Sequence, residues 1–150
     1  MREELSSAVK AAMKSGDRLR VDTLRMVQSA LKNREIEARG AGKSLSAEDE
    51  LSVLQKLVKS RQESVELYEK GGRQDLASKE RAEIAIISEF LPQQMGDDDM
   101  KSAIAAAIGA TGAAGMKDMG KVIGALRAKY AGRMDFGKAS ALVKAALSGR

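Results

Sequence analysis

The stretch MKDMGKVIGALRAKYAGRM, residues 116–134, decides how the last third of this chain folds. Its apolar residues recur at spacings of three and four, which is typical of an amphipathic helix lying on a core. The predicted buried stripe consists of Met116, Met119, Ile123, Leu126 and Tyr130. Successive helical residues are about 100° apart, so the opposite face carries basic and very small side chains. That face consists of Lys117, Lys121, Gly124 and Ala128, with Ala125 and Lys129 at its edge.

Gly124 lies in the middle of this predicted helix, and two interpretations of it stay open. Glycine costs about 1 kcal/mol relative to alanine in a helix interior, so it is often kept where a neighbouring helix crosses closely. Alternatively, a bare face lets another backbone approach while lysines supply charge, which suits a phosphate backbone. The first interpretation predicts a packed Gly124, and the second an exposed one.

The composition favours helices. Of 150 residues, 43% are hydrophobic but only 3% are aromatic, with no Trp and one Pro. Strands favour aromatic and β-branched residues, and no segment alternates with period two for long enough to form one. We therefore expect an all-α protein.

The ends and the apolar runs suggest a location. No apolar run approaches the roughly 18 residues of a membrane span. The sequence starts MREELSSAVK, with two acids and no apolar region typical of a secretory signal. From these absences we expect a cytoplasmic protein without membrane contact.

Missing residue types limit the chemistry. The chain has no Cys and no His, which rules out thiol nucleophiles, His-based triads and zinc sites with Cys or His ligands. Residues 115–121 match the start of a phosphate-binding GxxxxGK loop, but Val122 stands where a metal-binding hydroxyl is needed. We expect no catalytic residue, no cofactor and no metal. We also see no aromatic pair placed for base stacking.

Caps and turn residues divide the chain into two parts. Four helices are expected in residues 1–92, a linker at residues 93–98 with three consecutive acids, and three helices in residues 99–150. In the third helix Arg61 occupies an apolar register. We expect its stem to lie along the helix seam and its head to reach water; the alternative is a buried Arg paired with an acid of a neighbouring helix.

Positive charge is concentrated near the end. Residues 1–92 carry 17 basic and 16 acidic side chains, a net charge of +1. Residues 116–150 carry 8 basic and 2 acidic side chains, a net charge of +6. The last 35 residues therefore hold the positive field of the molecule.

Four blocks of the sequence stand out in order: LRMVQSALKNREIE (24–37), KSRQESVELYEKGGRQDL (59–76), EFLPQQM (89–95) and MKDMGKVIGALRAKYAGRMDFGKASALV (116–143). Together they give the chain a resemblance to the YqeY proteins of the GatB/YqeY family over nearly its whole length. The resemblance implies a helical bundle followed by a three-helix domain. That last domain resembles the tail of the B subunit of glutamine-dependent aspartyl/glutamyl-tRNA amidotransferase, where it is a tRNA-binding module.

The residues that carry this resemblance in the tail are Gly120, Val122, Gly124, Gly132 and Val143. The turn at residues 132–137 is one residue longer than in many relatives, which affects where Lys138 lies. Nothing in the chain resembles the phosphoryl-transfer body of the B subunit or the amidase residues of the A subunit. A label of carbon-nitrogen ligase activity would therefore be inherited from the tail alone.

We expect a non-catalytic tRNA-binding accessory protein that docks the tRNA backbone through its last domain. Its expected partners are tRNA and, in addition, an aminoacyl-tRNA synthetase or an amidotransferase. Two alternatives stay open: a helical module that docks a translation or amidotransferase enzyme, and a component of a ligase that uses glutamine as amide donor. The expected RNA-binding residues are Lys117, Lys121, Gly124, Arg127, Lys129, Arg133 and Lys138.

Overall fold

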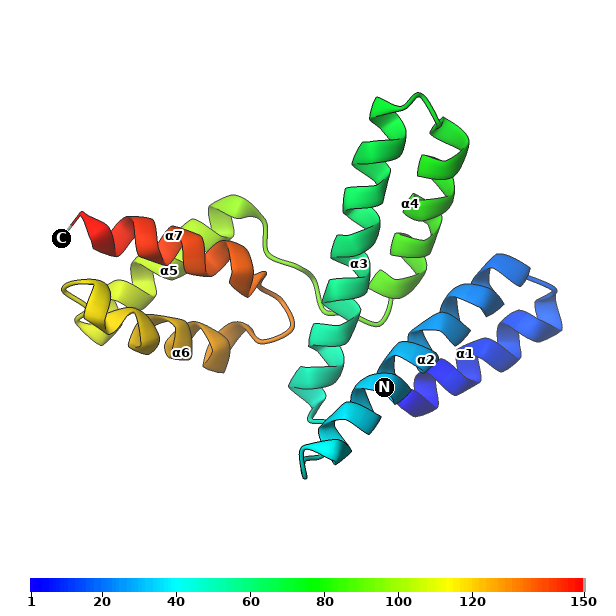
Figure 1. Cartoon of the computed structure of the whole chain (residues 1–150), viewed down its shortest axis with the longest axis horizontal. Helices are drawn as coiled ribbons and strands as arrows, with labels where there is room; N and C mark the ends of the chain where they lie inside the picture. Colours follow the sequence, from blue (N-terminus) through cyan, green and yellow to red (C-terminus); the bar gives the residue numbers. More distant parts are fainter. Residues whose placement is uncertain (150) are drawn as a thin grey trace. The chain divides into compact units, whose positions relative to one another are not determined.

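The computed structural model describes residues 1–149, which form seven α-helices, one 3₁₀ turn and no strand (Figure 1). The expectation of an all-α chain is confirmed. None of the helices in this range is long and apolar enough to cross a membrane. Two compact units can be distinguished, one spanning Met1–Pro92 and one beginning at Gln93. The helices are α1 Arg2–Ser15, α2 Arg18–Gly40, α3 Ala47–Lys70, α4 Gln74–Ser88, α5 Asp97–Thr111, α6 Met119–Tyr130 and α7 Phe136–Ser148, with the 3₁₀ turn η1 at Met116–Asp118.

In the first unit, α1 and α2 form a helical hairpin (Figure 1). Gly16 ends α1 with a φ of 73°, a left-handed conformation that glycine adopts without steric cost. Asp17 then caps α2, its side chain accepting a hydrogen bond from the backbone N–H of Arg20 at 3.1 Å. The glycine stop and the aspartate cap together define the turn between α1 and α2. Buried apolar side chains of all four helices fill the core: Leu5, Val9, Leu24, Val27, Leu31, Leu54 and Ile87.

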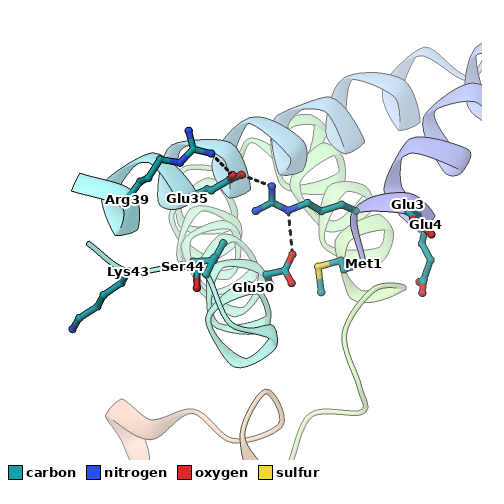
Figure 2. A pocket seen from close by; sticks show the side chains of 10 residues that line it. Met1, Glu3, Glu4, Glu35, Arg39, Lys43, Ser44 and Glu50 are labelled. Carbon is teal, nitrogen blue, oxygen red and sulfur yellow. Dashed lines mark hydrogen bonds and ion pairs between the residues drawn. The ribbon is translucent and has the colours of Figure 1, made fainter. Parts of the chain in front are cut away.

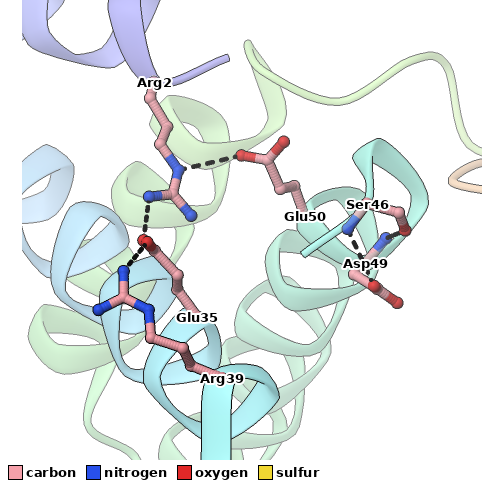
Figure 3. A network of polar contacts seen from close by, with 6 residues as sticks. All are labelled: Arg2, Glu35, Arg39, Ser46, Asp49 and Glu50. Atoms are coloured by element: carbon pink, nitrogen blue, oxygen red, sulfur yellow. Dashed lines mark hydrogen bonds and ion pairs between the residues drawn. The ribbon is translucent and has the colours of Figure 1, made fainter. Parts of the chain in front are cut away.

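The second hairpin of this unit joins α3 to α4 (Figure 1). Ser46 and Asp49 form a reciprocal capping box at the start of α3, with both hydrogen bonds at 3.1 Å (Figure 3). The pKa of Asp49 is lowered because its carboxylate accepts the backbone N–H and the hydroxyl of Ser46. Leu54 is the buried residue of α3, and several of its other apolar side chains are only partly buried, namely Leu51, Val53, Leu57, Val58 and Val65. This helix therefore lies at the edge of the core rather than across it.

Arg61 differs from its expected placement. Its Nε donates to Glu83 Oε2 on α4 at 3.0 Å, and its Nη1 donates to the carbonyl of Leu57 at 3.0 Å. Nη2 lies 3.5 Å from the Met26 sulfur on α2. The two charged side chains are only 16% and 17% exposed. The head of Arg61 does not escape to water, and the alternative, a largely buried Arg paired with an acid of a neighbouring helix, is correct.

The second unit is a cluster of α5, α6 and α7 around one core. Its most deeply buried side chains come from all three helices and from the turn before α7: Met100, Ile104, Val122, Leu126, Met134, Ala139, Val143 and Leu147. Three acids stand in the first turn of α5, where they complement the helix dipole, and the N-cap residue is Gly96, which makes no side-chain cap hydrogen bond. Asp135 does cap α7, accepting from the backbone N–H groups of Gly137 and Lys138.

The predicted stripe of the central helix is partly wrong. Val122 and Leu126 are the fully buried positions of α6, while Met119, Ile123 and Tyr130 pack only partly against the core. Met116 is 42% exposed. Met116 leaves the stripe because residues 116–118 form a separate 3₁₀ turn, which has a tighter period than the α-helix. Val122 belongs to the stripe, because it lies three residues after Met119 and four before Leu126 on one helical face.

A turn between α6 and α7 is held by the segment that follows the first unit. The side-chain amide of Gln94 donates to the Gly132 carbonyl at 2.7 Å, and the Met95 N–H donates to the Arg133 carbonyl at 2.9 Å. Arg133 Nε returns a hydrogen bond to the Gln93 carbonyl at 3.1 Å. Residues 93–95, expected as part of a linker, thus pack within the second unit. The boundaries 1–92, 93–98 and 99–150 otherwise stay a prediction.

Candidate functional site

The solvent face of α6 carries three of the expected RNA-binding residues, Lys121, Gly124 and Lys129. All three are exposed, together with Ala125 and Ala128 beside them. A Cβ built on Gly124 meets no atom within 4 Å among the described residues. The interpretation that a neighbouring helix crosses at Gly124 is therefore not realised, and the small side chains leave this face open.

Lys117 is also exposed, but it precedes α6 in the 3₁₀ turn. Between Lys117 and Lys121 lies Asp118, whose carboxylate accepts the Ala114 backbone N–H at 2.9 Å. The pKa of Asp118 is lowered first by this hydrogen bond, then by the Gly115 backbone, and further by the charges of Lys121 and Lys117. The carboxylate of Asp118 is therefore turned toward the backbone, and Lys117 and Lys121 are both close enough for their charges to lower its pKa.

Two further expected residues, Arg127 and Arg133, lie near the turn that follows α6. The Arg127 guanidinium carbon is 5.0 Å from the centre of the Phe136 ring, and that of Arg133 is 5.9 Å from the centre of the Tyr130 ring. Lys129 Nζ is 5.6 Å from the same Tyr130 ring. Each of these distances falls within the range of cation–π attraction.

The two aromatic residues are the ones that the sequence analysis missed as a site. Tyr130 was assigned to the buried stripe, and no pair of aromatic rings was expected to be placed for base stacking. In the structure Tyr130 ends α6 and Phe136 begins α7, one on each side of the same turn, and both are only partly buried, each with a cation over its ring. Gly132 lies between them in the sequence, and this glycine was the signal for a chain reversal that brings the end of α6 close to the start of α7.

Lys138 does not belong to the face formed by α6. It lies in the first turn of α7, where its ammonium group is 3.9 Å from a carboxylate oxygen of Asp97 at the start of α5. Both side chains are well exposed, so this ion pair is weak. Of the seven expected RNA-binding residues, Lys138 is the one that forms an ion pair with a carboxylate within residues 1–149.

A separate polar site exists in the first unit. Arg2 on α1 forms ion pairs with Glu35 on α2 and with Glu50 on α3, the latter at 3.3 Å, while Arg39 also bonds Glu35 at 2.7 Å (Figure 3). The pKa of Glu35 is lowered, chiefly by its hydrogen bond to Arg2. These side chains line an open pocket of about 630 Å³ (Figure 2). Because they pair with one another, the network links three helices.

Comparisons with known proteins extend over most of the chain. A family model described as Yqey-like protein matches residues 2–147. Curated relatives carry the name "Altered inheritance of mitochondria protein 41, mitochondrial". The protein of Lachancea thermotolerans is 38% identical over 89 residues, 59% of this chain and 46% of the relative. The protein of Vanderwaltozyma polyspora is 34% identical over 90 residues, which cover 58% of this chain and 46% of the relative. The protein of Kluyveromyces lactis is 36% identical over 86 residues, which cover 57% of this chain and 45% of the relative.

Two facts follow from these matches. The aligned part is a little under half the length of the curated relatives it matches. Their printed names place these relatives in mitochondria, which contradicts the expectation of a cytoplasmic protein. That expectation rested on the absence of an apolar span and of a secretory signal, and neither absence distinguishes the cytoplasm from the interior of an organelle. The cytoplasmic assignment is therefore corrected.

Proposed function

The chain belongs to the YqeY-like family, and on that premise we propose that it is a non-catalytic accessory protein that docks the phosphate backbone of tRNA on its second unit. The observation that carries the proposal is the open basic face of α6. Lys121 and Lys129 are exposed there, beside a Gly124 that touches nothing within 4 Å in the described chain. Such a face suits a phosphate backbone, because the cations attract it and the missing side chains let it come near.

The spacing of the cations along this face is compatible with a backbone. Lys121 and Lys129 are eight residues apart, which is about 12 Å along a helix axis, and Lys117 extends the row beyond the start of α6. Phosphate contacts position a nucleic acid without reading its sequence. The proposed docking is therefore sequence-independent, and specificity for a given tRNA would have to come from elsewhere.

The test replaces Lys117 and Lys121 by alanine together and measures tRNA affinity across salt concentrations. Each lost phosphate contact lowers the slope of log affinity against log salt by roughly one unit, so the double variant should flatten the slope by about two. The loss should be similar for different tRNAs. Both residues are exposed, so the melting temperature should stay within a few degrees of the wild type.

A matched control is available in α1. Lys10 and Lys14 are exposed and four residues apart, as Lys117 and Lys121 are, so Lys10→Ala with Lys14→Ala removes the same charge in the other unit. It should leave the salt slope nearly unchanged. An equal loss from both double variants would refute a localised site. Unchanged affinity in the Lys117 and Lys121 variant would remove this helix from the proposal.

Docking of a protein partner is a weaker candidate. The first unit does expose large apolar side chains, namely Met13, Ile36 and Leu67. They lie on three different helices, α1, α2 and α3. Singly exposed apolar residues are normal on protein surfaces, so these give the interpretation little support. A ligase role with glutamine as amide donor has no structural observation in its favour.

A further inference from the structure

The turn between α6 and α7 holds more cation–π contacts than a segment of its length usually does. Significant cation–π contacts occur roughly once per 70–80 residues in proteins. Here three fall within residues 127–136: Arg127 over Phe136, and Lys129 and Arg133 over Tyr130. Residues 1–149 contain no other cation–ring contact of this kind. Three cations of the second unit thus lie over its two partly buried rings.

We propose that this turn binds one unpaired nucleotide of an RNA strand, with its base stacked on the arginine–aromatic cluster and its phosphate beside Lys129 and Arg133. The inference rests on the proposed function, because it names the part of the RNA that meets the second unit. The cluster is defined here as Arg127, Lys129, Tyr130, Arg133 and Phe136.

The chemistry of the cluster favours an unpaired base over a duplex. Aromatic rings and planar guanidinium groups stack on the faces of bases, and those faces are accessible only where a base is unstacked. A guanidinium that already lies on a ring is oriented before the ligand arrives, so less side-chain freedom is lost on binding. Arg127 at 5.0 Å from the Phe136 ring centre is the best example.

The cations of the cluster are also free for a phosphate. Within residues 1–149, neither Arg127, Lys129 nor Arg133 forms an ion pair with a carboxylate; the contact of Arg133 is to the neutral Gln93 carbonyl. Asp135, the acid nearest in sequence, is occupied by capping α7. An exposed cation without an acidic partner keeps its full attraction for an anionic ligand.

The backbone under the cluster is held in one conformation. Gly132 takes a φ of 80°, and the side chain of Met134 is fully buried. The N–H groups of Arg133 and Met134 both donate to the Tyr130 carbonyl, at 2.9 and 3.2 Å. Together with the hydrogen bonds from residues 93–95, these contacts fix where the rings stand. A rigid platform is what stacking recognition requires.

The experiment uses Tyr130 as a reporter. The chain has two Tyr and no Trp, so Tyr68→Phe, a change in the first unit, leaves Tyr130 as the dominant fluorophore. In this background, a single-stranded oligonucleotide should quench Tyr130 fluorescence saturably, and a blunt duplex of the same sequence should not. Arg127→Lys keeps the charge but loses the planar group. It should weaken single-strand binding by up to about 5- to 160-fold, since a stacked base contributes roughly 1–3 kcal/mol, and leave duplex binding unchanged.

The outcomes separate the two proposals. Lys101→Arg, an exposed change in α5, serves as the matched control and should alter neither affinity. If the wild type binds both RNAs with a steep salt dependence but Arg127→Lys weakens them equally or not at all, the nucleotide site is refuted and backbone docking survives. If quenching appears while the Lys117 and Lys121 double variant keeps its salt slope, the turn is supported and the docking face on α6 is refuted. If neither RNA binds the wild type, both are refuted.

Discussion

At the scale of single residues, two ion pairs of the first unit show how burial determines the cost of removing one partner. The Arg61–Glu83 pair links α3 to α4 with both side chains less than a fifth exposed. The Arg73–Asp75 pair stands at the surface, with side chains that are 59% and 67% exposed. Removing one member of a buried pair leaves a charge without a partner in a poorly solvated place, whereas an exposed pair is replaced by water.

We therefore expect Arg61→Met to lower the free energy of unfolding by about 1–3 kcal/mol, measured by urea denaturation. Replacing Glu83 by Met as well should recover at least half of the loss, because no unpaired charge remains. The exposed control Arg73→Ala should change stability by less than about 0.5 kcal/mol. A loss in the double variant as large as in Arg61→Met would mean that the arginine acts through packing and not through its charge.

The carboxylate of Glu35 predicts a pH effect. Its pKa is lowered in the folded state, first by Arg2, so it stabilises the fold above its unfolded pKa of about 4.3 and this stabilisation is lost as pH falls through the folded pKa. Glu35→Gln should consequently lose less stability than the wild type between about pH 6 and about pH 3 in denaturant titrations. Glu37→Gln, an exposed change on the same helix, should follow the wild-type curve; parallel curves for all three would contradict the role of Glu35.

At the scale of secondary structure elements, α6 shows which features follow from sequence and which do not. Spacing predicted a helix with an exposed basic face, and Lys121, Gly124 and Ala128 are exposed as expected, because this periodicity is a local property. The exposure of Met116 was not predictable, since it depends on a 3₁₀ turn that packs against both α6 and α7. The burial of Val122 does fit the helical spacing, because Val122 lies between Met119 and Leu126 on one face.

The candidate site follows the same division. Its charges could be counted along the sequence, but the arginine–aromatic cluster could not. Arg127 and Phe136 lie nine residues apart and meet only because the chain reverses at Gly132. Likewise, Arg61 has the pattern of a snorkelling residue, and only the position of Glu83 on α4 shows that it is paired. Contacts across a reversal or between helices depend on tertiary packing, which periodicity does not encode.

Gly124 allows the exposed interpretation of α6 to be tested by stability alone. Its φ is helical and a Cβ would meet nothing, so Gly124→Ala should raise the free energy of unfolding by up to about 1 kcal/mol. Gly112 in the same unit is equally uncrowded but has a φ of 67°, so Gly112→Ala should instead destabilise by about 1 kcal/mol. A lower melting temperature for Gly124→Ala would show that another helix packs at this position after all.

At the scale of the whole molecule, the division after Pro92 predicts that each unit folds by itself. Each has its own buried core, and the segment that joins them, residues 93–95, bonds to the turn of the second unit. A chain of about 60 residues buries a smaller fraction of its surface than a larger domain does, and it is only marginally stable. The second unit should therefore depend strongly on those few residues at its start.

We expect fragments 1–92 and 93–150 each to unfold cooperatively, with circular dichroism spectra that add up to that of the full chain. Fragment 96–150 should be less stable than fragment 93–150 by about 1–3 kcal/mol, because it lacks the three hydrogen bonds between residues 93–95 and the turn, each contributing about 1 kcal/mol, and the partial packing of Met95. Gln94→Ala in fragment 93–150 removes one of these bonds and should lie between the two. An unfolded fragment 93–150 would mean that the second unit needs the first. Equal stability of fragments 93–150 and 96–150 would mean that residues 93–95 are a linker that does not stabilise the second unit.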